Sequence, residues 1–293
     1  MPTADQHAVK TYRYLRLAMI ALVVGLGTSV VFEWTEQGRS CLKTSISAYY
    51  YTPVQAFFVS ALVAIGVCLI CLKGSTEWDD TLLNLAGAFA PVVALVPTPN
   101  AGACPEKAEQ VVLRDPNVLN NVTALLVVGG LAILVTAILA GVDRRQGVST
   151  ERSSGIGMAV VVLVWVLTLV AFVSHRRWFT DNAHYTAAIS MFACIVIVVS
   201  LNALGLGRRR RAQGEAQGKR AVVNRYLYIA IAMVASVIGA LVWKWTSGFD
   251  HAVLFIEAAL ILLFATFWLA QTAELWAAGL REEPAAPETA IVT

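Results

Sequence analysis

Residues 118–141 read VLNNVTALLVVGGLAILVTAILAG, a run of 24 residues without a charged side chain. At about 1.5 Å per residue a helix of this length spans about 36 Å, enough to cross the roughly 30 Å hydrocarbon core of a bilayer. Similar apolar runs recur along the chain, at 15–33, 53–72, 81–97, 118–141, 156–174, 183–206, 226–245 and 252–276. The sequence therefore predicts an all-α fold, a polytopic transmembrane helical bundle with about eight spans.

The overall composition excludes an ordinary soluble protein. Of the 293 residues, 58% are hydrophobic and only 14% are charged, whereas soluble domains are about 45–50% apolar and about 25% charged. Eight helices use most of the chain, so we expect a single transmembrane domain over residues 1–280 and no appended domain. Residues 281–293 are too polar to fold alone and are expected to form a disordered cytoplasmic tail.

The distribution of basic residues predicts the orientation. With a cytoplasmic amino terminus, 15 of the 22 Lys and Arg residues fall on the inner side, which is the positive-inside pattern. Both termini are then cytoplasmic, as an even number of spans requires, and we expect a multi-pass protein of the plasma (inner) membrane. The first apolar run, Leu15 to Trp34, is too long for a cleaved signal peptide and has no small-residue cleavage site, so we expect it to be retained.

The five cysteines divide by expected depth. Cys41 and Cys104 fall in two different outer loops, where a disulfide persists, so they are a candidate disulfide pair or, alternatively, two free thiols. Cys68 and Cys71 have the spacing of a redox or zinc motif but lie in an apolar helix without a second ligand pair. We therefore expect no metal site and no cofactor.

Ionisable groups in the hydrocarbon layer cost at least roughly 2.5–3.5 kcal/mol each and are useful pointers to function. Glu257 is expected about 9 Å along the last helix, too deep for a short side chain to reach water easily. Further polar residues are expected towards the outer side. Two of them, Arg177 and Asp181, are expected in the loop before the sixth span. We predict an outward-facing ligand pocket formed by Tyr50, His184, Lys244 and Glu257, with Arg177 and Asp181 at its rim.

Two structural readings compete with this pocket. A Glu257–Lys244 ion pair would by itself explain both charges, and the tyrosines of the segment Ser45 to Pro53 are typical of an aromatic belt at a membrane surface. No HExxH, GxSxG or Walker motif occurs in the sequence. A catalytic residue is therefore not assigned.

The segment Ser45-Ile-Ser-Ala-Tyr-Tyr-Tyr-Thr-Pro53, with Phe57-Phe-Val59, Asn84-Leu-Ala-Gly87 and Ala94-Leu-Val-Pro-Thr98, resembles an uncharacterised bacterial multi-pass membrane family of unknown function. That family is distantly similar to the Frag/DRAM group, whose members have an Ile-Ser-containing outer loop before the second helix and a His near the start of a later helix. Ser45 to Ser47 and His184 match these features. The resemblance implies a role in membrane-lipid remodelling.

The residues support four kinds of function. The first is binding or handling of a lipid or small amphiphile in the outward pocket, with membrane lipids as partners. The alternatives are a proton-coupled secondary transporter with Glu257 as the proton carrier, a membrane-embedded hydrolase or transferase with His184 as the base, and a structural partner without a small ligand. Nothing indicates nucleic-acid binding, because the arginine run Arg208 to Arg211 lacks interleaved aromatic residues. The oligomeric state is not indicated.

Overall fold

A computed structural model describes residues 4–39, 42–99, 114–146, 152–214 and 223–276. Within these ranges the chain is helical and contains no strand. The elements are α1 (Ala4–Glu36), the 3-10 helix η1 (Ser47–Tyr51), α2 (Gln55–Cys71), α3 (Glu77–Leu95), α5 (Arg114–Arg145), α6 (Arg152–Ser174), α7 (Arg176–Ala212), α9 (Arg225–Ser247) and α10 (Ala252–Glu274).

The all-α prediction is confirmed, and each of the eight apolar runs coincides with one α-helix in the described ranges. Six of these helices, α1, α5, α6, α7, α9 and α10, are long and apolar enough to cross a membrane, and α2 is a shorter apolar helix. Helix α3 has 19 residues and carries acidic side chains in its first turn. The architecture is that of a polytopic membrane protein.

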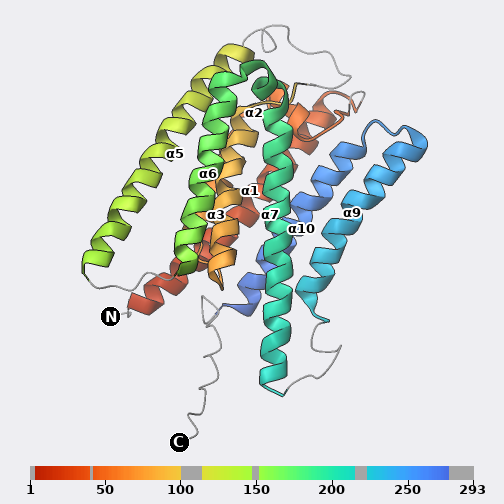
Figure 1. Cartoon of the computed structure of the whole chain (residues 1–293). Coiled ribbons are helices and arrows are strands. Elements are labelled where there is room, and N and C mark those ends of the chain that lie inside the picture. The colour runs from red at the N-terminus through yellow and green to blue at the C-terminus, as the bar shows by residue number, and fades with distance from the viewer. Residues whose placement is uncertain (1–3, 40–41, 100–113, 147–151, 215–222, 277–293) are drawn as a thin grey trace, which may run out of the picture.

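Successive helices run in opposite directions, so the molecule has two ends (Figure 1). One end carries η1, the last turn of α1 and the first turn of α10, and is called the η1 end below. The other end carries the start of α1, the α2–α3 connection and the last turn of α10, and is called the Arg16 end because Arg16 lies there. The first and last helices therefore bring the two ends of the described chain to the same side.

Six helices form a closed ring. Helix α1 packs against α2, α2 against α3, α3 against α7, α7 against α9, α9 against α10, and α10 against α1. Side chains from all six helices fill the interior, with Met19, Leu69, Met233 and Phe267 among the most completely buried. Helices α5 and α6 lie outside the ring, packed against α3 (Figure 1), and their outer faces are apolar and exposed.

Glycines allow α2 and α3 to approach closely. A Cβ atom on Gly66 would lie 2.7 Å from the carbonyl oxygen of Gly87, and one on Gly87 would lie 2.6 Å from that of Gly66. Both distances are below 3.0 Å, which real Cβ atoms essentially never show. In lipid the hydrophobic effect does not drive helices together, so helix association depends on van der Waals packing, and small residues at a crossing allow this packing to be close.

Polar caps at the Arg16 end fix where two helices begin. The hydroxyl of Thr76 accepts a hydrogen bond from the amide of Asp79 (3.2 Å) at the start of α3. The side chain of Asn224 accepts from the amides of Tyr226 (3.0 Å) and Leu227 (3.2 Å) and so begins α9. Its amide nitrogen also donates to the Ala203 carbonyl of α7 (2.8 Å), which ties α7 to α9. Caps of this kind each stabilise a helix start by about 1 kcal/mol.

Candidate functional site

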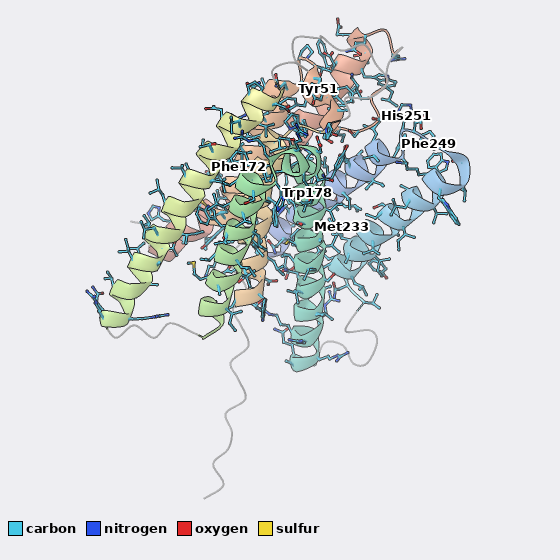
Figure 2. The ribbon with its side chains drawn as sticks, turned by 45° about the horizontal axis from the view of Figure 1, so that its top comes forward. Tyr51, Phe172, Trp178, Met233, Phe249 and His251 are labelled. Carbon is cyan, nitrogen blue, oxygen red and sulfur yellow. The ribbon has the colours of Figure 1, made fainter. Side chains whose placement is uncertain are left out.

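The 3-10 helix η1 closes one end of the helix ring. All of its residues, Ser47 to Tyr51, are buried, and the rings of Tyr50 and Tyr51 meet edge to face with their centroids 5.4 Å apart. The hydroxyl of Tyr51 donates to the Thr98 carbonyl (2.7 Å), just after α3. Figure 2 shows Tyr51 and His251 at this same end. The three tyrosines are therefore part of the packed interior and do not form an exposed aromatic belt.

The Glu257 side chain connects α10 to η1 by hydrogen bonds. One carboxylate oxygen accepts hydrogen bonds from the amides of Ile46 (2.5 Å) and Ser47 (3.3 Å), and the other accepts from the Ser47 hydroxyl (2.8 Å). One turn earlier, the amide of Leu254 donates to the Thr44 carbonyl (3.0 Å). The carboxylate predicted to face a ligand thus satisfies the donors of the chain that leads into η1.

His184 on α7 contacts a different segment, the chain that follows α3. Its ring nitrogen Nδ1 lies 2.7 Å from the carbonyl oxygen of Val96, and because a carbonyl only accepts, Nδ1 is the donor. The neighbouring Tyr185 shares a hydrogen bond with the Thr98 hydroxyl (2.9 Å). His184 is only 2% exposed, so the observed arrangement ties α7 to the segment after α3 and provides no open path to the imidazole.

The remaining residues of the predicted pocket lie apart from this network. Lys244 is exposed on α9, and the predicted Glu257–Lys244 ion pair does not form in the described part of the chain. Arg177 and Asp181 are exposed, but they belong to the first turns of α7 and not to a loop. That expectation was wrong because α7 begins at Arg176, before its apolar run. The outward-facing pocket itself stays a prediction.

The structure describes three of the five cysteines. Cys41 and Cys104 lie outside the described residues, so the candidate disulfide is not addressed. Cys68 and Cys194 are buried and Cys71 is exposed, all as free thiols. Among the residues that the structure describes, no group of three His, Cys, Asp or Glu side chains is placed to hold a metal ion.

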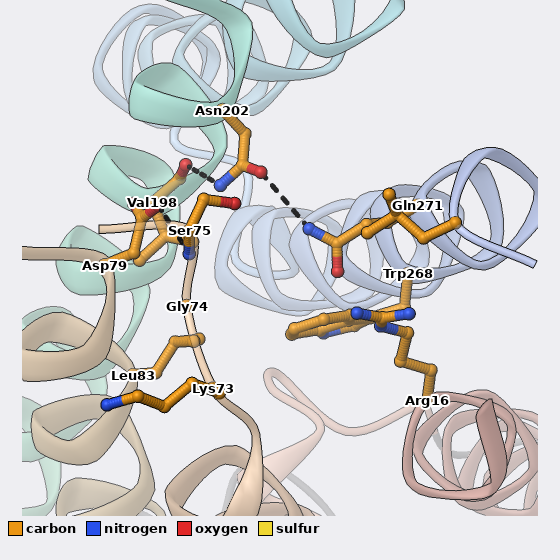
Figure 3. Close-up of a pocket in the computed structure, with 11 residues that line it drawn as sticks. Arg16, Lys73, Gly74, Ser75, Asp79, Leu83, Val198, Asn202, Trp268 and Gln271 are labelled. Carbon is orange, nitrogen blue, oxygen red and sulfur yellow. Dashed lines mark hydrogen bonds between the residues drawn. The ribbon is translucent and has the colours of Figure 1, made fainter. Parts of the chain in front are cut away.

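A small polar cavity lies at the opposite, Arg16 end of the ring. It measures about 10 Å³, which is about the space needed for one water molecule. Side chains from α1, α3, α7 and α10 and the α2–α3 connection surround it (Figure 3). The lining residues are Arg16, Lys73, Gly74, Ser75, Asp79, Leu83, Val198, Asn202, Trp268, Gln271 and Leu275.

Amide side chains connect two walls of this cavity. The Gln271 side chain on α10 donates to the Asn202 side-chain oxygen on α7 (3.2 Å), and Asn202 donates to the Val198 carbonyl (2.9 Å). Arg16 extends from α1 towards Trp268 of α10 (Figure 3). Both Arg16 and Trp268 are 2% exposed. The indole nitrogen Nε1 of Trp268 is buried and donates to no acceptor in the described part of the chain.

The α2–α3 connection forms the more open edge of the cavity. The ammonium group of Lys73 pairs with the carboxylate of Asp80, which also accepts from the Gly74 amide. Its hydrogen bond to Asp80 raises the pKa of Lys73 above the ordinary value of 10.5. The Ser75 amide donates to Asp79 (3.3 Å), a buried carboxylate that lines the cavity. Positive and negative groups therefore face each other at this edge.

The predicted site did not include this cavity, although the sequence contains signals for it. Arg16 and Gln271 are not among the residues of the predicted pocket. Asn202 was not singled out. A search for single amides and charges inside long apolar runs would have found Arg16, Asn202 and Gln271, because such groups are costly in a membrane and need a protein or water partner.

Comparison with known proteins adds no family assignment: no protein-family model, curated protein or solved structure matches the chain.

Proposed function

We propose that the protein binds or handles a lipid or small amphiphile, and that the polar part of this ligand reaches the cavity at the Arg16 end. The observation that carries the proposal is the buried indole N–H of Trp268, which lines a polar cavity between helices and has no acceptor among the described residues. A buried donor left unsatisfied costs about 1–3 kcal/mol. A ligand or water oxygen in the cavity would remove this cost.

The position of the cavity favours an amphiphile over a water-soluble ligand. It lies at the ends of helices whose middle parts are long, apolar and exposed on their outer faces. A ligand there has a polar group at the membrane surface and an apolar part along the helices. We place the Arg16 end on the cytoplasmic side of the inner membrane, because most basic residues of the chain fall on that side. The resemblance to the Frag/DRAM group, which implies a role in membrane-lipid remodelling, also supports a lipid or amphiphile as the ligand.

Two other functions have less support. For a proton-coupled transporter, Glu257 and Gln271 would need a polar path between them, but they are about 21 Å apart along α10. Of the four buried α10 residues between them, Leu260, Phe264 and Phe267 are apolar, and Trp268 contributes a single polar atom near the Gln271 end. For a hydrolase or transferase, the Ser47 hydroxyl donates to Glu257 and not to His184, and the His184 side chain is buried.

Native mass spectrometry of the protein released from nanodiscs tests the proposal. The nanodiscs contain phosphatidylethanolamine and phosphatidylglycerol, and the readout is the number of lipids that stay bound after activation. We expect retained lipid in the wild type and less in Gln271→Leu, which makes one cavity wall apolar. Gln55→Leu replaces a partly exposed amide at the η1 end and is the matched control.

Each alternative outcome overturns part of the proposal. If the wild type retains no lipid above the level of an unrelated membrane protein, amphiphile binding is wrong. If Gln271→Leu, with an unchanged melting temperature, retains as much lipid as the wild type, the ligand does not reach this cavity.

A further inference from the structure

We infer that the seam between α1 and α10 at the Arg16 end is a binding site for a group with anionic oxygens, of the phosphate or phosphodiester type. The inference rests on the proposed function and names the chemistry of the ligand's polar part. Its basis is a set of N–H donors that α1 and α10 present side by side. On α10 this is the indole of Trp268, which is 2% exposed and has no acceptor within the described ranges. On α1 it is Arg16 together with Arg13.

Arg13 is the second donor that lacks an acceptor. Its Nε atom is buried and forms no hydrogen bond in the described part of the chain, and its guanidinium group lies 4.7 Å from the ring centroid of Trp276. Arg13 lies three residues before Arg16, so both project from the same side of α1. Trp276 directly follows Leu275, which lines the cavity. Arg13 therefore extends the donor set from the cavity towards the membrane surface.

Two acidic groups at this end form ion pairs with basic side chains. Asp80 pairs with Lys73, and Glu274 accepts from Arg225 (2.8 Å) and from the Tyr226 hydroxyl. Asp79 is an acidic residue that lines the cavity together with Arg16 and Lys73. Arg13 forms no ion pair with a described carboxylate. The α1–α10 seam therefore carries at least one guanidinium charge, that of Arg13, without an ion-pair partner among the described residues.

Guanidinium groups suit this ligand because their planar donors match the oxygens of phosphates and carboxylates. A buried indole N–H adds a neutral donor of fixed direction. The cavity of about 10 Å³ holds no more than one oxygen-sized group, so one oxygen would enter beside Trp268 while the rest of the anion contacts Arg13 at the surface. The same chemistry fits a lipid headgroup and free inorganic phosphate, and the test separates the two.

The test follows the indole N–H signal of Trp268 by NMR, in full-length protein held in neutral maltoside micelles. Trp268→Phe assigns the signal among the eight tryptophans. Three probes are titrated separately: phosphatidylglycerol, phosphatidylcholine with the same acyl chains, and inorganic phosphate. Arg13→Gln is the test variant. Lys10→Gln removes one charge from an exposed side chain on the same helix and is the matched control.

We expect phosphatidylglycerol to shift the Trp268 signal and to bind more tightly than phosphatidylcholine. Arg13→Gln should weaken phosphatidylglycerol binding about tenfold, the change for losing one hydrogen bond between charged groups, whereas Lys10→Gln should change it less than twofold. Equal binding of the two lipids overturns the inference and leaves amphiphile binding intact. An equal loss in both variants also overturns it, since surface charge alone would then explain the preference. A shift with phosphate and with neither lipid supports the anion site and refutes the proposed amphiphile.

Discussion

Removing the Glu257 carboxylate should loosen η1 from α10. Glu257→Ala leaves two amides and one hydroxyl without their acceptor, and each hydrogen bond to a charged group contributes about 1.5–3 kcal/mol. The sum of about 4.5–9 kcal/mol is an upper bound, because the side chain is only partly buried and water can replace some of the bonds. We expect a loss of about 3–5 kcal/mol in the free energy of unfolding.

Glu257→Gln should cost much less, about 1–2 kcal/mol. Its amide oxygen can still accept from Ile46 and Ser47, and the Ser47 hydroxyl can accept from the new NH₂ group. The assay is equilibrium unfolding in mixed micelles with a rising fraction of sodium dodecyl sulfate, followed by circular dichroism. Glu36→Gln, an exposed carboxylate at the same end, is the control and should be nearly neutral. A loss below about 1 kcal/mol in Glu257→Ala would refute the view that this carboxylate holds η1 in place.

Three further predictions follow from the packing and the ion pairs. Gly87→Leu should separate α2 from α3 at Gly66 and lower the melting temperature more than any other single change considered, measured by thermal unfolding in detergent. His184→Ala should cost about 2–4 kcal/mol, through one lost hydrogen bond and the cavity left behind, measured in the same micelle titration. Asp80 raises the pKa of Lys73 in the folded protein. The contribution of this ion pair to stability should therefore be complete below about pH 10.5 and be lost as the pH rises through the folded pKa. The difference in melting temperature between wild type and Lys73→Gln should be constant from pH 7 to about pH 10 and should narrow above that.

The apolar runs predicted the helices well because hydrocarbon imposes a length and a composition on any segment that crosses it. They predicted helix ends poorly where a helix continues into water. Helix α7 begins at Arg176 and ends at Ala212, beyond the apolar run 183–206 at both ends. For the same reason the sequence pattern predicts a loop at Arg177 and Asp181, which lie in α7.

The candidate site was harder to predict. Hydropathy indicates how deep in the membrane a residue lies, but it does not indicate which neighbouring helix the side chain faces. His184 and Glu257 contact mainly backbone groups, the Val96 carbonyl for His184 and the amides of Ile46 and Ser47 for Glu257. Every residue has a backbone amide and carbonyl, so the sequence does not show which of them bond to a side chain. A carboxylate that binds backbone amides therefore cannot be distinguished in the sequence from one that binds a ligand. The cavity at the Arg16 end depends on four helices meeting, which requires the ring order of the fold.

The most direct test of ligand binding at the Arg16 end is a cryo-EM structure of the protein in nanodiscs of phosphatidylethanolamine and phosphatidylglycerol. The account predicts headgroup density in the α1–α10 seam, with an oxygen within about 3 Å of the Trp268 indole nitrogen and acyl-chain density continuing along the outer faces of these helices. A seam closed by protein side chains alone, with Trp268 bonded to one of them, would contradict it.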